Sequence, residues 1–121
     1  MFNLMKPKAP PPSAGSPEFN LSIKYQINAM GDDGTASRHV VHYCYPEDGI
    51  TAAKPEILQD IALSLGLSVK PAATAGGFVF EHRSEVATSM FDQLTTKLAE
   101  QLRDCGYDYD GWECAVVTQS F

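Results

Sequence analysis

Apolar residues recur along this chain with two periods, which predicts both strands and helices. Alternation over residues 21–28, LSIKYQIN, is typical of a strand with one buried face. The run HVVHYCY at 39–45 is apolar on both faces and predicts a central strand. Three further short runs indicate strands: SVKPAAT at 68–74, where Pro71 favours a sheet edge, FVFEH at 78–82 and WECAVV at 112–117.

Helical spacing of apolar residues appears twice. The first helix is expected between Pro55, which a helix tolerates in its first turn, and Gly66, which can supply a left-handed residue after the last turn. Ser84 is the expected N-cap of a longer amphipathic helix that Gly106 ends. The apolar stripes are Ile57, Leu58, Ile61, Ala62 and Leu65 in the first helix and Ala87, Phe91, Leu94, Leu98, Leu102 and Cys105 in the second.

This order of elements predicts a single α+β domain over residues 20–121. Two amphipathic helices need one sheet face to cover, and the ferredoxin-like sandwich, a four-stranded antiparallel sheet with two helices on one face, provides it. The strand at 21–28 is then an extra N-terminal strand, which can lie at an edge, cover the open face or join a dimer. Residues 1–19, rich in Pro, Ala, Ser and Gly, are expected to form a flexible tail.

Composition and charge narrow the function classes. The 121 residues carry a formal net charge of -6 at pH 7, which argues against general affinity for nucleic acid or anionic membranes and favours a basic protein partner. No apolar run approaches the roughly 20 residues of a membrane span. Three sparse cysteines fit a reducing compartment better than a disulfide scaffold. We therefore expect a cytoplasmic protein.

Catalytic and metal-binding motifs are weak. His42 and Cys44 share a strand face, but two ligands do not make a zinc site. His82, Ser84 and Glu85 are neighbours along the chain, which does not provide the geometry of a triad, and His82 is expected at the surface end of its strand. The chain has no P-loop and no dinucleotide fingerprint. We expect no cofactor, no metal and no enzymatic activity.

Direct RNA binding is also disfavoured. Many ferredoxin-like sheets bind RNA through aromatic side chains, and Tyr43, Tyr45, Phe78 and Phe80 lie on predicted strands. However, the Lys/Arg-Gly-Phe pattern of such sheets is missing and the net charge has the wrong sign. An apolar open face is better explained by a covering element or by a second subunit, so a homodimer through this face or the extra strand is compatible with the pattern.

The candidate site lies in CGYDYDGWECAVV, residues 105–117. Gly111 is expected to adopt a conformation that a side chain would forbid, Asp110 to accept backbone N–H groups in a turn, and Trp112 to pack against the helix end. One interpretation is a structural corner. The other, compatible with it, is an acidic rim around aromatic anchors that suits an Arg-rich partner. The candidate protein-binding residues are Tyr107, Asp108, Tyr109, Asp110, Gly111, Trp112 and Glu113.

The same passage carries a family resemblance. LAEQLRDCGYDYDGWE at 98–113, ALSLGLSV at 62–69 and VHYCYPED at 41–48 resemble the regulator of ribonuclease activity B (RraB) family, over about residues 38–117. The resemblance implies a ferredoxin-like α+β fold and a non-enzymatic role, in which the family binds the endoribonuclease RNase E and restrains RNA decay. The family's type members carry an acidic N-terminal helix and an acidic C-terminal tail, where this chain has a Pro-rich segment and a predicted strand.

Three functions follow from these patterns. The leading hypothesis is an acidic regulator of a basic partner such as RNase E. The alternatives are an immunity protein that neutralises a nuclease toxin and an uncharacterised small enzyme, which a deep pocket with convergent polar groups would support.

Overall fold

The computed structural model describes residues 13–47, 55–74 and 76–118, so the predicted tail over residues 1–12 lies outside the described residues. The described residues form three helices and four strands. In chain order these are α1 (Pro17–Asn28), β1 (Arg38–Pro46), α2 (Pro55–Leu65), β2 (Ser68–Pro71), β3 (Phe78–Ser84), α3 (Ser89–Asp104) and β4 (Tyr107–Cys114).

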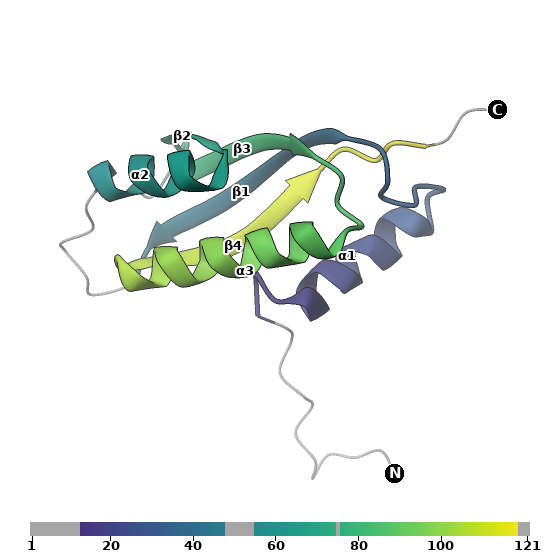
Figure 1. The fold of residues 1–121 in the computed structure, drawn as a ribbon, viewed down its shortest axis with the longest axis horizontal. Coiled ribbons are helices and arrows are strands. Elements are labelled where there is room, and N and C mark those ends of the chain that lie inside the picture. Colours follow the sequence, from purple (N-terminus) through teal and green to yellow (C-terminus); the bar gives the residue numbers. More distant parts are fainter. Residues whose placement is uncertain (1–12, 48–54, 75, 119–121) are drawn as a thin grey trace, which may run out of the picture.

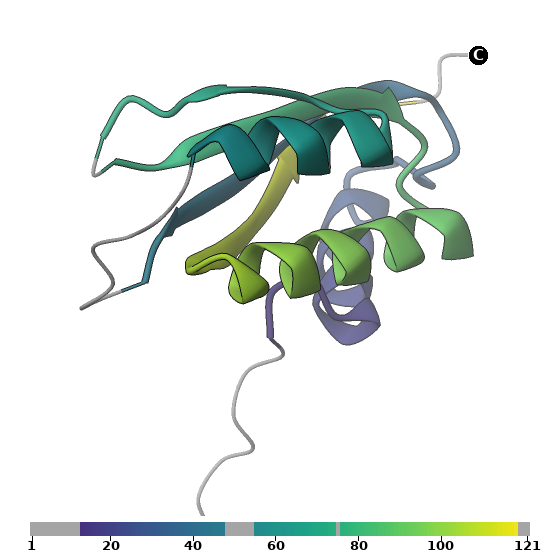
Figure 2. The ribbon, with the colours of Figure 1, turned by 60° about the vertical axis from the view of Figure 1, so that its left-hand side comes forward.

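The four strands form one antiparallel sheet in the order β2-β3-β1-β4. The prediction of a central strand at 39–45 is confirmed, because β1 pairs with both β3 and β4, and β2 lies at an edge as Pro71 indicated. Helices α2 and α3 lie over one face of the sheet (Figures 1 and 2). The α+β prediction is therefore confirmed, and the sheet is compatible with a ferredoxin-like type.

Helix α2 follows its predicted stripe, with Leu58, Ile61 and Ala62 buried against the sheet. Gly66 ends it in a left-handed conformation, with φ 73°. The chain then folds back, because the Leu67 amide donates to the Ala62 carbonyl at 2.8 Å and the Leu67 side chain is buried. These contacts direct the chain straight into β2.

Helix α3 begins later than predicted. Ser84 is the last residue of β3, where it pairs with Arg38 of β1, and the N-cap is Thr88. The Thr88 hydroxyl oxygen accepts a hydrogen bond from the Phe91 amide at 3.1 Å. Both residues suit an N-cap, but β3 continues to Ser84 and the helix starts only at Ser89, so the predicted start was wrong by about one turn.

The predicted N-terminal strand is wrong, because residues 17–28 form the helix α1. Ser16 is its N-cap and accepts from the Phe19 amide at 3.1 Å, while Pro17 occupies the first turn. Residues 17–19 therefore belong to the domain and not to the predicted tail. Helix α1 lies beside α3 on the β4 side of the sheet (Figures 1 and 2).

The alternating pattern of α1 misled the prediction because its buried stripe is narrow. Only Asn20 and Ile27 are fully buried, and one of them is polar. Leu21 and Tyr25 are 47% and 67% exposed, whereas Phe19, Ile23 and Ile27, which are spaced four residues apart, pack inward.

Buried residues under the helices form two clusters. The α2 cluster lies below α2 and the second half of α3, and the α1 cluster lies where α1, the start of α3 and the end of β4 meet. The α2 cluster consists of Cys44, Leu58, Ile61, Ala62, Leu67, Phe80, Leu98, Leu102 and Tyr107. The α1 cluster consists of Ile27, Val40, Val86, Phe91 and Trp112.

Candidate functional site

The candidate motif lies inside a strand and not in a turn before one. Strand β4 starts at Tyr107, directly after Gly106, and ends at Cys114, so the predicted strand at 112–117 was placed too late. Its side chains alternate as the sequence indicated. Tyr107 is buried and Asp108 and Asp110 are exposed, so the first aromatics and acids of the motif point to opposite faces.

Gly111 reverses this alternation. In the pairing of β4 with β1, Tyr43 lies opposite Gly111 and Cys44 opposite Tyr109, so Asp110 is an extra residue in a β-bulge. Gly111 has φ 113°, which confirms its predicted backbone, although in a bulge. Without the extra residue, Trp112 would point away from the helices, whereas the bulge places Trp112 in the core and Glu113 outside.

The structure thus divides the seven candidate residues between two faces. Tyr107 and Trp112 are 2% and 5% exposed and belong to the core clusters, although Trp112 also borders the hollow described below. Tyr109 packs against both clusters. Trp112 contacts the start of α3, with its ring 4.8 Å from that of Phe91, and not the end of that helix as predicted. The acids Asp108, Asp110 and Glu113 are exposed.

The exposed acids border a hollow on the sheet face away from α2 and α3. Two tyrosines of β1, Tyr43 and Tyr45, alternate with the buried His42 and Cys44 and therefore point to this face. The hollow has a volume of about 330 Å³. We call it the β4 hollow, and its lining consists of Phe19, Tyr43, Tyr45, Asp110, Gly111, Trp112 and Glu113.

A hydrogen bond orders one wall of the β4 hollow. The Tyr43 hydroxyl donates to Glu113 Oε1 at 2.5 Å. This bond, with a smaller contribution from burial, raises the pKa of Tyr43 to about 12. Tyr43 therefore stays protonated at neutral pH, and its hydroxyl is bonded to the Glu113 carboxylate.

Helix α1 supplies the opposite wall. The Phe19 ring lies against Gly111, because a Cβ added to Gly111 would come within 3.0 Å of Phe19 Cζ. Sequence reasoning missed Phe19 by assigning it to the tail. The signal was present in Ser16-Pro17-Glu18, an N-cap followed by proline and an acid in the first turn.

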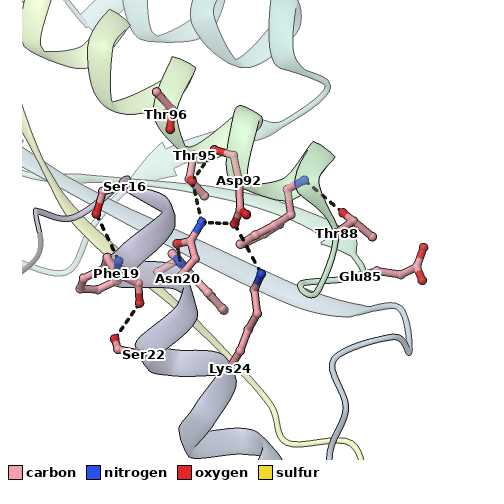
Figure 3. Close-up of polar contacts among 12 residues, drawn as sticks. Ser16, Phe19, Asn20, Ser22, Lys24, Glu85, Thr88, Asp92, Thr95 and Thr96 are labelled. Carbon is pink, nitrogen blue, oxygen red and sulfur yellow. Dashed lines mark hydrogen bonds and ion pairs between the residues drawn. The ribbon is translucent and has the colours of Figure 1, made fainter.

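A buried amide holds α1 in this position (Figure 3). Asn20 is fully buried, and its Nδ2 donates to Asp92 Oδ1 at 2.8 Å and to Thr95 Oγ1 at 2.9 Å on α3. Its Oδ1 accepts from Trp112 Nε1 at 2.6 Å on β4. Lys24 adds an ion pair to Asp92 at 3.7 Å. Asn20 thus joins three elements and fixes the helix that carries Phe19.

Two histidines are also brought together, on the other face of the sheet. His42 Nε2 lies 3.0 Å from His82 Nε2, and His42 Nδ1 lies 2.7 Å from the Tyr109 hydroxyl oxygen. His82 is half-buried, so it is less exposed than the predicted surface position near the end of its strand. Sequence spacing gave no signal for this pair, because the antiparallel register of β1 and β3 creates it.

The remaining chemical candidates are not assembled into a site. All three cysteines are free thiols, and burial raises the pKa of Cys44 to about 12, so it is unreactive at neutral pH. Residues 13–47, 55–74 and 76–118 contain no group of three or more His, Cys, Asp or Glu side chains suited to a metal ion. In the same part of the chain, no helix is both long and apolar enough to cross a membrane.

Comparison with known proteins gives no assignment. No family model matches the chain. No curated protein matches it either.

Proposed function

We propose that this protein is a non-enzymatic binding module that holds a basic segment of a partner protein in the β4 hollow. The observation that carries this proposal is the combination of three aromatic side chains and two carboxylates around one hollow of about 330 Å³. The Phe19, Tyr43 and Tyr45 rings offer apolar surface and π faces, while Asp110 and Glu113 offer negative charge. Lysine and arginine side chains need both of these features.

The charge of the whole chain supports the same proposal. A net charge of -6 gives a field that attracts basic surfaces and repels nucleic acid. Asp108 lies opposite Tyr45 in the sheet and is exposed, so a third carboxylate lies beside the hollow. We expect binding to weaken as salt increases, because exposed charges are screened.

The motif resemblance points to an RNase E-type endoribonuclease as the partner. In this proposal the protein acts in the cytoplasm and restrains RNA cleavage by occupying a basic segment of the enzyme. The sheet order supports it, since a ferredoxin-like fold is what the resemblance implies. Helix α1 matches the type members of the RraB family only in being a helix before the core, since its charged residues are one acid, Glu18, and one base, Lys24.

The experiment measures binding to purified RNase E by calorimetry at low and moderate salt, together with the rate of RNA cleavage. We expect the native protein to bind and to slow cleavage. The double variant Asp110→Asn/Glu113→Gln should bind roughly tenfold more weakly, which corresponds to about 0.7 kcal/mol for each exposed charge lost.

A matched control separates the hollow from net charge. The variant Glu56→Gln/Asp60→Asn removes the same two charges from the exposed side of α2, away from the hollow, and should bind like the native protein. Equal weakening in both variants would show that only net charge matters and would overturn the role of the hollow. Absence of any binding to RNase E would remove that partner, and a nuclease toxin would then be the next basic protein to test.

A further inference from the structure

A chain of three hydrogen-bonding side chains crosses the sheet beneath α3, outside the β4 hollow. Its centre is His42, which is fully buried between Tyr109 of β4 and His82 of β3 at the distances given above. Phe91, in the first turn of α3, lies over both imidazoles with ring centroids 6.1 Å from His42 and 6.3 Å from His82. The three side chains therefore connect β1, β3 and β4 below the start of α3.

The contact between the imidazoles limits how many protons they hold. A hydrogen bond between the two Nε2 atoms needs one nitrogen that donates and one that accepts, so only one of them carries a hydrogen. When both rings are neutral, the Tyr109 hydroxyl completes the chain by donating to or accepting from His42 Nδ1. If both rings were imidazolium ions, both Nε2 atoms would carry a hydrogen, N–H would face N–H at 3.0 Å, and the buried His42 would be charged.

His82 gives this chain a route to solvent. It lines a pocket of about 210 Å³ between the end of β3 and the start of α3, together with Ser84, Glu85, Thr88, Met90, Phe91 and Leu94. His42 is fully buried, contacts His82 and does not line this pocket. Protons from solvent therefore reach His82 first.

Few titratable groups face the pair within the described residues. They are Tyr109 from β4, Glu85 at the pocket and His39 from β1, whose charge acts on His82. Helix α3 contributes the uncharged side chains Met90, Phe91 and Leu94 to the pocket. Burial is thus the main influence on both imidazoles.

The sign of the pH dependence follows from burial. Loss of solvation lowers the pKa of His42 to about 3, and the neighbouring His82 lowers it further; loss of solvation also lowers the pKa of His82. A histidine in the unfolded chain has a pKa of about 6.5, so below that pH the unfolded state binds more protons than the folded state. The stability that these rings contribute is present above pH 6.5 and is lost as the pH falls toward 3.

We propose that His42, His82 and Tyr109 form an acid-sensitive latch that holds the start of α3 on the sheet. At neutral pH one of the two Nε2 atoms carries a hydrogen and donates it to the other, and the latch is closed. Acidification favours the open state, in which the solvated rings take up protons. In that state His82 is separated from His42, the Phe91 ring loses its place over the imidazoles, and the first turns of α3 are freed. The α2 cluster contains no such group and stays folded while the latch opens.

Hydrogen exchange of the full chain, followed by NMR at pH 7 and pH 5 and corrected for intrinsic rates, tests the latch. Amides of residues 91–95 in α3 should open several-fold more often at pH 5 than at pH 7, because the open state takes up protons that the closed state excludes. Amides of residues 59–63 in α2 should change little. Uniform acceleration of both segments would overturn the proposal, because it would show global destabilisation without a latch.

Two variants separate the latch from other histidines. His82→Gln keeps hydrogen-bonding atoms but cannot be charged, and we expect it to reduce the response of residues 91–95. His39→Gln removes a histidine whose side chain is 54% exposed and should respond like the native protein. If the His82→Gln variant responds fully, or if His39→Gln removes the response, the assignment to His82 is wrong.

The ring nitrogen signals of the native protein provide a test that does not depend on a variant folding. We expect His42 to stay neutral through pH 5. Titration of both His42 and His82 near pH 6.5 in the folded protein would overturn the latch.

Discussion

The α2 cluster and the α1 cluster both lie between the helices and the sheet, but different kinds of interaction stabilise them. The α2 cluster consists of aliphatic and aromatic side chains with the thiol of Cys44. The α1 cluster is surrounded by polar side chains that are themselves buried: Asn20, Asp32, Arg38, His42 and Thr95. Every buried side-chain nitrogen and oxygen of the described residues has a hydrogen-bond partner, so this polarity is compensated.

The difference shows what each cluster contributes. Apolar packing is non-directional, so the α2 cluster supplies stability without fixing one arrangement. Hydrogen bonds have direction, and an unmade bond in a buried site is costly. The α1 cluster therefore fixes where α1 and the end of β4 lie. Because Phe19 and Gly111 meet there, it also shapes the β4 hollow.

The largest effect is expected from Arg38→Met. Arg38 and Asp32 are 2% and 1% exposed and form a two-pronged ion pair, which holds the pKa of Asp32 well below its usual range. The variant leaves the Asp32 carboxylate buried without its countercharge. The free energy of unfolding, measured by chemical denaturation, should fall by about 3–5 kcal/mol.

Lys70→Met is the control for that change. It removes the 2.8 Å ion pair with Glu81, in which the Lys70 side chain is 65% exposed, so the loss should stay below about 1 kcal/mol. Similar stability of the two variants would show that the buried pair is not what distinguishes the α1 cluster.

Asn20→Leu should have a smaller effect that concentrates on α1. Leucine has nearly the shape of asparagine, but it leaves Trp112 Nε1 and Thr95 without their buried partner. We expect a loss of about 1–3 kcal/mol, measured by denaturation, together with faster proteolysis at α1. The comparable swap in the α2 cluster, Leu58→Met, should cost less than about 1.5 kcal/mol. Equal sensitivity of both clusters to such swaps would remove the contrast between them.

Gly111→Ala tests the difference between the two clusters at a single backbone position. Gly111 and Gly66 both have positive φ. A Cβ added at Gly111 would come within 3.0 Å of the Phe19 ring, whereas a Cβ added at Gly66 would have no neighbour within 4 Å. We expect Gly111→Ala to lower stability by more than about 1 kcal/mol and Gly66→Ala to cost less. A Gly111→Ala variant with an unchanged melting temperature would contradict the role of the bulge.

Prediction from sequence succeeded where apolar periodicity and burial coincide. Helix α2, most of α3 and the central strand β1 follow their apolar residues, because packing against the sheet selects those faces. It failed at α1, whose most buried residue near its start is Asn20. Phe19, Ile23 and Ile27 do recur at helical spacing and pack inward, but Phe19 was assigned to the tail, so the alternation of Leu21 and Ile23 with polar neighbours was given too much weight.

The candidate site was predicted in part for the same reason. The acids of the motif are exposed as alternation indicated, and Gly111 has the backbone conformation expected of it. The other walls of the hollow come from Phe19 and from Tyr43 and Tyr45, which are far from the motif in sequence. Their proximity depends on the pairing of β4 with β1 and on the position of α1.

The sequence by itself determined the α+β class, the central and edge strands, the two helices over the sheet and the acidic character of the motif. Those features depend on local propensity and on the period of apolar residues, which are properties of short segments. Only the tertiary structure decided that the bulge turns Trp112 inward, that Asn20 fixes α1 and that His42 meets His82. Each of these depends on hydrogen bonds between residues 40 to 92 positions apart, and no short segment specifies such partners.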